Sequence, residues 1–321
     1  MLTLFTIPKP FRGHIGIIQR NAIQSWMRFQ PECEIILCGD EEGTAEVAIE
    51  FGVRHLQAVD RNKYGSPLLN SMFENVQDAC HHDILAYVNS DIILFQNFIE
   101  AVKCIPLDRP FVMIGRRWDL DITKPLDFGL RDWEERLRRD LTKNGVLRYG
   151  YAVDYFAFSK GLWTDIPPFA VGRPGYDNWL IYRACKARER IINATRVVTC
   201  IHQNHERTYA SVGLKGPRGE THLRGGVETE RNLEMMGGED RRFSVRDADW
   251  VIDKHGLTKA PLTRARLFRQ LDTLPVLRTN SGLLFWVGKV WLYVSRFPRA
   301  VARRAKLVLS TPSNVPSANS P

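Results

Sequence analysis

The first ninety residues alternate between short apolar runs and longer stretches with helical spacing. The apolar runs have the length of β-strands and lie at residues 2–7, 34–38, 54–59 and 84–88. Between them, apolar residues recur three or four positions apart, as on the buried face of a helix. The sequence therefore predicts helices over residues 15–29, 45–51 and 66–79, with Ser66 as the N-cap and Pro67 in the first helical position of the last.

This alternation of strands and helices predicts the fold class. Consecutive parallel strands need crossover helices, and those crossovers are right-handed in nearly all proteins. We therefore expect an α/β protein with a Rossmann-like, mostly parallel sheet. Further along the chain, the pattern predicts strands at 110–115, 153–158 and 196–201 and helices near 96–104, 131–143 and 177–188.

One apolar run ends abruptly on a polar triplet. Residues 84–88 are followed by Asn89, Ser90 and Asp91. In a parallel sheet, ligands bind outside the carboxyl ends of the strands, so Asp91 is the first candidate for chemistry. The alternative is an ordinary polar turn, since Asn, Ser and Asp are common turn residues.

Several classes of protein are disfavoured by what the sequence lacks. No Gly-x-Gly-x-x-Gly follows the first strand and no P-loop motif occurs, which argues against dinucleotide enzymes and P-loop NTPases. The six cysteines form no Cys-x-x-Cys pair, so we interpret them as reduced thiols rather than as zinc ligands or disulfides. The first residues contain no charged leader followed by a long apolar segment, which predicts a cytoplasmic protein.

The positive charge of the chain is concentrated near its end. Residues 260–321 contain eight Arg and two Lys against one Asp, which equals the whole formal charge of +9. This distribution argues against a nucleic-acid partner. Residues 281–297 are mostly apolar but too short for a typical membrane span, so with the arginines they predict peripheral association with an anionic membrane. A helix packed on the protein itself is the alternative.

Four motifs, in this order, resemble the GT-A superfamily of nucleotide-sugar glycosyltransferases over roughly residues 1–255. They are the N-terminal alternation of strands and helices, the Asn89-Ser90-Asp91 triplet in place of the family's Asp-x-Asp, the Gly-rich segment 172–179 with Asp177, and the strand-terminal His202. The sequence departs from the family pattern at Asn89, which leaves Asp91 as the direct metal ligand.

The resemblance implies a divalent-metal-dependent enzyme that moves a sugar from a nucleotide diphosphate to a hydroxyl acceptor, either a glycan or a lipid-linked molecule. The metal, Mn²⁺ or Mg²⁺, would be held by Asp91 and His202, with His205 as a competitor, and would stabilise the leaving diphosphate. Asp177 would be the general base, although Asp is also a common helix cap. The nucleotide would contact Thr6, Asp40, Asn62, Asn89 and Asp91.

The acceptor is expected on the other side of Asp91. Candidate contacts are Arg117, Trp118, Asp154, Asn178 and Trp179. Asp154 lies among apolar residues and is therefore either buried with a partner or an acceptor contact. Asp119 and Asp121 form the one literal Asp-x-Asp near a strand end, but the neighbouring arginines favour an ion-paired loop there. Asp40 is equally well interpreted as a cap of the second helix.

The predicted organisation is a catalytic domain over 1–259, a basic helical tail over 260–310 and a disordered end over 311–321. Within the domain, residues 1–95 form the nucleotide-binding half and 96–259 the acceptor half. The polar, Gly-rich segment 206–226 is typical of loops that close over ligands, and its Arg207, Lys215 and Arg218 would meet the diphosphate. A sugar nucleotidyltransferase and a non-catalytic membrane-associated adaptor are the alternatives.

Overall fold

The computed structural model describes residues 2–205, 214–215, 221–222 and 226–278. The chain divides into two units, residues 1–262 and 263–321, and each is considered by itself. All six cysteines are free, as predicted.

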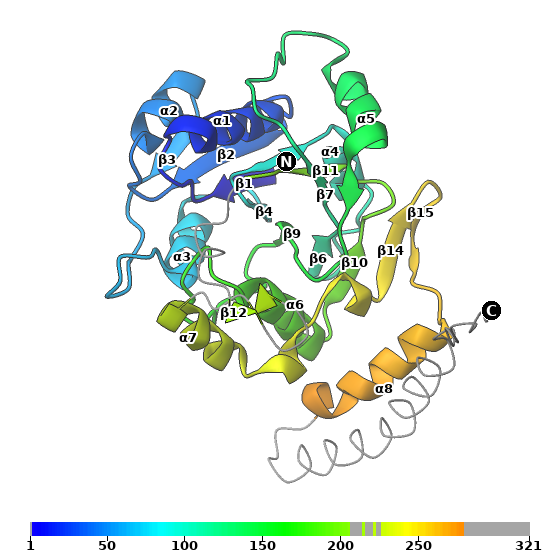
Figure 1. Ribbon diagram of the computed structural model, residues 1–321. Helices are drawn as coiled ribbons and strands as arrows, with labels where there is room; N and C mark the ends of the chain where they lie inside the picture. The colour runs from blue at the N-terminus through cyan, green and yellow to red at the C-terminus, as the bar shows by residue number, and fades with distance from the viewer. Residues whose placement is uncertain (1, 206–213, 216–220, 223–225, 279–321) are drawn as a thin grey trace, which may run out of the picture. The chain divides into compact units, whose positions relative to one another are not determined.

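The first unit is built on a nine-stranded sheet in the order β3-β2-β1-β4-β9-β6-β10-β14-β15 (Figure 1). Its strands are β1 (Leu2–Thr6), β2 (Cys33–Cys38), β3 (Arg54–Leu56), β4 (Ile84–Val88), β6 (Phe111–Ile114), β9 (Tyr155–Ser159), β10 (Arg190–Asn193), β14 (Trp250–Asp253) and β15 (Gly256–Lys259). All pairings are parallel except those of β9 with β4 and β6 and that of β15 with β14. The predicted α/β class with a mostly parallel sheet is confirmed.

Helices cover both faces of this sheet. One face packs on α1 (Gly13–Met27), α2 (Thr44–Phe51) and α4 (Asn97–Lys103), which contribute Trp26, Val47 and Phe98 to a shared apolar core. The other face packs on α3 (Leu69–Ala79) and α6 (Tyr176–Ala187), with α7 (Gly226–Met236) beyond α6 (Figure 1). The main sheet is therefore the middle layer of three.

Aromatic rings fill the space between the sheet and α3. Phe5 of β1 lies edge-on to Phe73 of α3, with ring centroids 5.1 Å apart, and Phe73 stacks on Phe158 of β9. Tyr87 and Trp163 complete this cluster, and no ring in it is more than 2% exposed. Successive strand residues point to opposite faces, so β1 supplies Leu4 to one core and Phe5 to the other.

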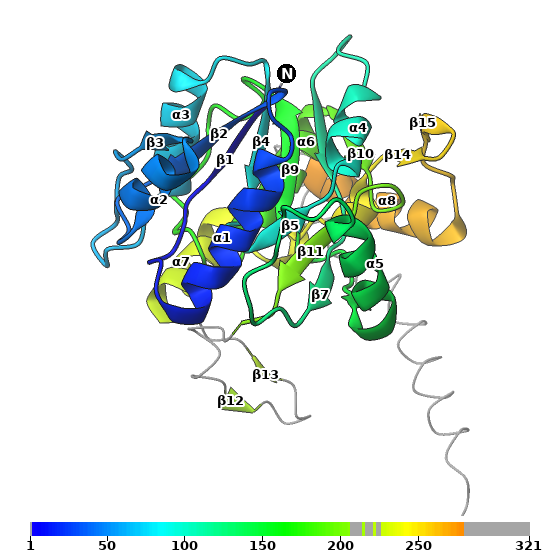
Figure 2. The same cartoon turned by 90° about the horizontal axis from the view of Figure 1, so that it is seen from above.

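A second, four-stranded sheet runs in the order β5-β11-β7-β8. It consists of β5 (Ile92–Leu94), β11 (Cys200–Gln203), β7 (Trp118–Leu120) and β8 (Val146–Leu147). Figure 2 shows β5, β11 and β7 between α1 and α5 (Trp133–Asn144). Ile93, Ile201 and Leu120 form a separate apolar cluster with Leu137 and Leu141 of α5. The charged helix predicted at 131–143 therefore buries only a narrow apolar stripe, which contains Leu137 and Leu141.

The small sheet is tied to α1 by buried polar contacts. The Gln203 side chain donates to the carbonyl of Ile18 at 2.7 Å and accepts from Asn21 at 3.0 Å. The indole of Trp26 donates to the carbonyl of Ile92 at 3.0 Å. Because unpaired buried polar groups are costly, these bonds fix where the small sheet lies against the main core.

Three local predictions were wrong. The strand predicted at 196–201 is replaced by β10 and β11, because the turn at 194–199 separates two shorter strands. The helix predicted from Ser66 begins at Leu69 with Leu68 as its N-cap, since Pro67 instead pairs with Arg61 in a β-bridge. Asp40 does not cap the second helix, whose N-cap is Gly43.

Part of the predicted tail lies outside the described residues. The second unit contains α8 (Arg264–Arg278), whereas the apolar run 281–297 and the end 311–321 are not described. Of segment 206–226, the structure describes the short pair β12 (Leu214–Lys215) and β13 (Thr221–His222) and the first residue of α7. Within the described part of the chain, no helix is both long and apolar enough to cross a membrane.

Candidate active site

Asp91 lies in a tight turn between β4 and β5. The backbone N–H of Asn89 donates to the carbonyl of Asp154, and the Ser90 hydroxyl donates to Gln19 at 2.8 Å. The Asn89 side chain donates to the Asp154 carboxylate at 2.7 Å. The turn predicted as the alternative for this triplet is therefore present, and it holds Asp91 at the carboxyl end of the central strand.

Two histidines join Asp91 because β11 runs antiparallel to β5. His202 lies opposite Ile92 in that pairing, one residue after Asp91. Nε2 of His205 is 2.9 Å from Oδ2 of Asp91, and Nε2 of His202 is 3.6 Å from the same oxygen. One ligand atom from each of the three side chains lies within 4.8 Å of the others. Sequence reasoning left His202 and His205 as competitors, but the structure brings both to Asp91.

These three side chains fit a divalent ion. Among the residues that the structure describes, Oδ1 of Asp91 and Nδ1 of His202 are buried and have no hydrogen-bond partner, so the cluster retains unused polar capacity. One carboxylate and two imidazoles suit Mn²⁺ or another first-row metal better than Mg²⁺, which prefers oxygen ligands only.

The protonation states also suit metal binding. Burial alone would raise the pKa of Asp91, but the hydrogen bond from His205 and the charges of His202 and Lys9 outweigh it and hold that pKa well below its usual value. Burial lowers the pKa of His202, against the opposing attraction of Asp91. A charged carboxylate and a neutral imidazole are the forms that bind metals.

A buried ion-pair network lies beside the cluster. Arg117 donates to both oxygens of Asp154 at 2.7 and 2.8 Å and to Asp119 at 3.0 Å. Arg148 donates to the second oxygen of Asp119 at 2.5 Å. Asp154 is therefore buried with a partner, one of the two predicted outcomes. Asp119 is ion-paired with its neighbour Arg117, as expected, and also with Arg148, which was not predicted.

Asp177 lies in the first turn of α6, after Gly172 and Gly175. Both glycines have positive φ, 78° and 113°, so this sharp approach to the helix favours glycine. Burial and the nearby charge of Asp154 raise the pKa of Asp177 to about 6, although backbone N–H groups, such as that of Asn178, oppose the shift. A carboxylate with this pKa can accept a proton near neutral pH.

An open cavity of about 520 Å³ adjoins the histidines. Its lining consists of Arg117, Asp119, Arg148, Tyr149, Tyr151, Ala152, His202, Asn204 and His205. Tyr149 and Tyr151 are 74% and 49% exposed, and flat exposed rings of this kind can stack on sugars. Sequence reasoning missed both tyrosines. The sequence feature that could have identified them is the pair of tyrosines on either side of Gly150, shortly after the charged helix predicted at 131–143.

The predicted acceptor residues differ in where they lie. Arg117 lines the cavity, and Trp118 packs partly buried against the apolar cluster of the small sheet. Asn178 is buried and donates to the carbonyls of Tyr151 and Phe243. Trp179 is 5% exposed, and neither it nor Asn178 is among the cavity lining. An acceptor role for Asn178 and Trp179 stays a prediction.

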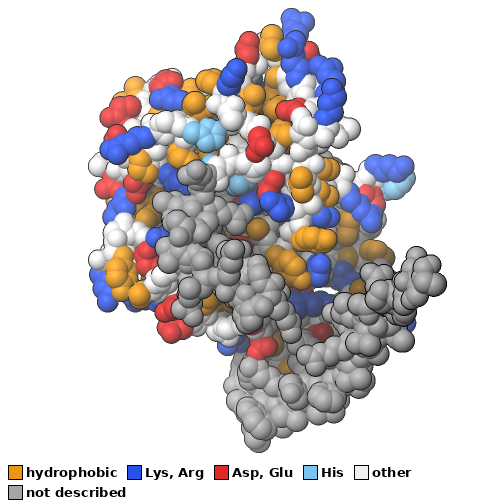
Figure 3. Space-filling view, in the orientation of Figure 1, with side chains coloured by type: hydrophobic (Ala, Val, Ile, Leu, Met, Phe, Trp, Pro, Cys, Tyr) orange, Lys and Arg blue, Asp and Glu red, His pale blue; other side chains and the backbone are white. Residues whose placement is uncertain are grey.

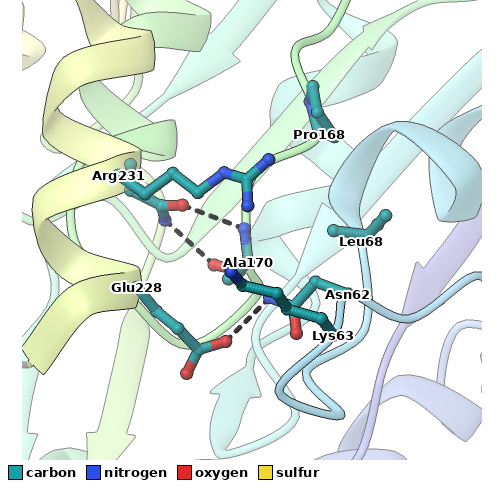
Figure 4. Close-up of a pocket in the computed structure, with 8 residues that line it drawn as sticks. Asn62, Lys63, Leu68, Pro168, Ala170, Glu228 and Arg231 are labelled. Atoms are coloured by element: carbon teal, nitrogen blue, oxygen red, sulfur yellow. Dashed lines mark hydrogen bonds between the residues drawn. The ribbon is translucent and has the colours of Figure 1, made fainter.

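The predicted nucleotide contacts follow the first three strands of the main sheet. Thr6 is buried, with its hydroxyl unpaired in the structure. Asp40 is exposed and paired with Arg61, which lowers the pKa of the Asp40 carboxyl. Asn62 lines a smaller pocket of about 280 Å³ beside α7, where its amide donates to Glu228 (Figure 4). Lys63 and Arg231 reach toward the same space (Figure 4).

One face of the molecule, shown in Figure 3, carries charged side chains of both signs. On the face in Figure 3, acidic and basic side chains are interspersed. Specific recognition of an anionic ligand here therefore depends on individual residues and on the ion cluster rather than on a broad positive surface.

Comparison with solved structures finds nucleotide-sugar glycosyltransferases. Mannosyltransferase PcManGT from Pyrobaculum calidifontis, solved with GDP-Man and Mn²⁺, is 13% identical at a TM-score of 0.45, over 97% of this chain and 81% of that one. Glucosyl-3-phosphoglycerate synthase from Mycobacterium tuberculosis, solved with Mn²⁺, uridine diphosphate and phosphoglyceric acid, is 16% identical at 0.42, over 82% and 87%.

A third match is shorter. S. aureus TarS in complex with UDP is 13% identical at a TM-score of 0.30, and the chain spans about a third of it, with 37% of this chain and 36% of that one aligned. No protein-family model and no curated protein sequence matches the chain. The matched structures belong to the class that the sequence motifs resemble.

Proposed function

We propose that the protein is a divalent-metal-dependent glycosyltransferase that moves a sugar from a nucleotide diphosphate to a hydroxyl acceptor. The observation that carries this proposal is the convergence of Asp91, His202 and His205 at the carboxyl end of β4. In an open α/β sheet this edge is where ligands bind. The cluster combines a charged carboxylate with two imidazoles, next to a cavity with exposed aromatic rings.

Asp91, His202 and His205 would hold the ion. A bound divalent cation supplies charge neutralisation for the diphosphate that leaves when the anomeric bond breaks. The protein's part is to fix its three side chains, through the Asn89–Asp154 hydrogen bond on one side and the β5–β11 pairing on the other. The nucleotide would extend from there toward Thr6, Asp40 and Asn62.

Asp177 is proposed as the general base that removes the proton from the acceptor hydroxyl. Its pKa of about 6 leaves it mostly ionised at neutral pH and still basic enough to take the proton. The acceptor would lie in the 520 Å³ cavity, against Tyr149 and Tyr151, and its hydroxyl would extend toward Asp177, which is not itself among the lining residues. Arg117 and Asp154 neutralise one another, so we assign them the role of holding Asn89 rather than binding the acceptor.

The test is calorimetric titration of nucleoside diphosphates and nucleotide sugars, with and without Mn²⁺. We expect one nucleotide to bind tightly only with the ion, and Asp91→Ala to weaken this binding more than about 100-fold, since losing a second-shell partner alone can cost that much. The matched control is Asp121→Ala, because Asp121 is exposed and bonds to Asn204 instead.

Other outcomes point to the alternatives. Absence of nucleotide binding by folded protein would contradict the proposal and favour the adaptor. Metal-dependent binding with formation of a nucleotide sugar from a sugar phosphate would identify a nucleotidyltransferase. Transfer from the bound nucleotide sugar to a hydroxyl compound is the product that supports a glycosyltransferase.

The proposed partners include an anionic membrane surface. In α8, Leu267, Leu271 and Leu274 are 44%, 39% and 46% exposed, and their spacing places them on one helix face. Exposed Arg264 and Arg278 lie at the two ends of this helix. Apolar residues flanked by arginines fit a surface of anionic lipid, and the tail carries the net charge of the chain.

Vesicle co-sedimentation tests this partner. We expect binding to phosphatidylcholine vesicles that contain phosphatidylglycerol, weaker binding at high salt, and little binding to pure phosphatidylcholine. Leu271→Asp should reduce binding, whereas Leu107→Asp, a change at an exposed leucine of the first unit, should not. Equal binding by both variants would contradict a role for α8.

A further inference from the structure

His202 lies between two carboxylates. Its Nε2 is 3.6 Å from Oδ2 of Asp91, and its Nδ1 is 3.6 Å from Oδ1 of Asp119. The parallel pairing of β11 with β7 sets His202 directly beside Asp119. The two ring nitrogens therefore face different acids, one in the ion cluster and one outside it.

The second acid is held firmly in place. Asp119 is 4% exposed, and Arg117 donates to the oxygen that faces His202 while Arg148 donates to the other. Arg117 is itself buried and fixed by Asp154. Since both oxygens of Asp119 already receive guanidinium donors, Asp119 is poorly placed to bind an ion directly, but Oδ1 retains a lone pair toward the ring.

A neutral imidazole has one N–H and one lone pair, and the partner of the first nitrogen decides which nitrogen can bind a metal. Metal-bound histidines usually donate their other N–H to a carboxylate or carbonyl. Nδ1 of His202 is buried and has no hydrogen-bond partner within the described part of the chain, and Asp119 is the carboxylate beside it.

We propose that Asp119 is a positioning residue that accepts the Nδ1–H of His202 and so directs the Nε2 lone pair toward Asp91 and the ion. This inference rests on the metal site of the proposed function. The separation of 3.6 Å must shorten to about 2.7–3.2 Å for a hydrogen bond to form. Such contacts commonly tighten when a site is loaded.

The first experiment measures Mn²⁺ affinity in the absence of nucleotide, by electron paramagnetic resonance of the free ion. We expect Asp119→Ala to weaken binding about 10–100-fold, the range for second-shell partners. Asp119→Asn should remain within about fivefold of the wild type, since a neutral acceptor is roughly half as strong. Buried Arg117 keeps the amide oxygen facing His202, whereas Arg148, whose side chain is 54% exposed, can turn away from the amide NH2.

The control is Asp121→Ala, which removes a carboxylate two residues away that does not face the ring and should leave Mn²⁺ affinity unchanged. If folded Asp119→Ala binds Mn²⁺ as well as this control does, the inference is wrong. It is also wrong if Asp119→Asn is as weak as Asp119→Ala, because charge rather than an acceptor would then be responsible.

The second experiment needs no variant and stands even if Asp119→Ala does not fold. In the Zn²⁺-loaded protein, long-range proton–nitrogen correlation spectra should place the His202 proton on Nδ1. A proton on Nε2 would overturn the inference and leave the metal site intact. Failure of the wild type to bind either ion would instead overturn the proposed function, which keeps the two failures distinguishable.

Discussion

The two sheets of the first unit use their strands differently. In the nine-stranded sheet, the central strands β1, β4 and β9 bury apolar side chains on both faces, between α1 and α2 on one side and α3 on the other. In the four-stranded sheet, β7 and β11 present apolar side chains to α5 and the polar pair Asp119 and His202 to the site.

We infer that the large sheet mainly determines the stability of the fold, whereas the small sheet mainly positions the groups that bind the ion. The large sheet contributes mostly hydrophobic burial, which is not directional and tolerates repacking. The small sheet contributes buried hydrogen bonds and ion pairs, which are costly unless complete and which fix positions closely. Changes to the apolar contacts of the large sheet should therefore alter the free energy of unfolding, and changes to the polar contacts of the small sheet should alter ion binding.

The largest effect is expected for Phe73→Ala. This ring is 0% exposed and touches Phe5, Tyr87 and Phe158, so its removal should lower the free energy of unfolding by about 3–5 kcal/mol. Mn²⁺ affinity of the folded protein should stay within twofold. Urea unfolding and Mn²⁺ titration measure the two quantities, with Ile49→Ala, at an 83% exposed position, as control. If the Mn²⁺ affinity of the folded variant also fell, this separation of stability from ion binding would be contradicted.

Asp177→Asn should lower turnover about 100-fold or more, since a general base typically contributes 10²–10⁴-fold. Nucleotide binding in the presence of Mn²⁺ should be unchanged, because Asp177 is not part of the ion cluster. Steady-state rates and calorimetry on the same preparation give both values. The control is Asp165→Asn, at an exposed carboxylate paired with Arg183. Unchanged turnover would exclude Asp177 as the base.

The pH dependence of kcat/KM gives a smaller effect, one factor of ten per pH unit. The base acts only when ionised, and its pKa is raised to about 6. Activity should therefore be level above about pH 6 and fall tenfold per unit below it, whereas a carboxylate with an ordinary pKa would keep activity level down to about pH 4. A profile without a limb near pH 6 would contradict this assignment.

The smallest effect is expected on the outside of α5. Arg136 pairs with Asp132 in an exposed i,i+4 contact at 2.9 Å. Arg136→Gln should change the free energy of unfolding by no more than about 0.5 kcal/mol and leave Mn²⁺ affinity unaltered. Leu137→Ala, one residue on but buried against the small sheet, is the matched comparison and should cost about 2–5 kcal/mol. Equal losses in the free energy of unfolding for the two variants would show that the packing of α5 on the small sheet does not stabilise the protein.

The sequence was sufficient to predict the large sheet because its pattern is local. Strand β4 was predicted with its observed bounds, and β1, β2 and α1 to within two residues. Each of these elements buries a continuous or periodic apolar face, and that periodicity is visible in one segment at a time. The antiparallel direction of β9 was not predicted, because a short apolar run carries no information about its direction.

The small sheet was missed for the opposite reason. Its strands have two to four residues, and β7 lies in a segment interpreted as an ion-paired loop. Asp91 was proposed from its place at the end of an apolar strand and His202 from the order of motifs. The place of His205 depends on the pairing of β11 with β5, over a hundred residues away in the chain. The sequence of either segment, taken alone, does not reveal such a pairing.

Strand β9 has a consequence for the order of folding. It lies between β4 and β6, which are consecutive parallel elements of the main sheet, and it bonds to both in the antiparallel direction. A growing chain that has not yet reached residue 155 therefore has the strands β3, β2, β1 and β4 on one side of a gap and β6 alone on the other. Asp154, which anchors Asn89 and Arg117, immediately precedes this strand. The strand that joins β6 to β4 thus also brings the carboxylate that anchors Asn89, so the support of Asp91 is in place before β11 adds the two histidines.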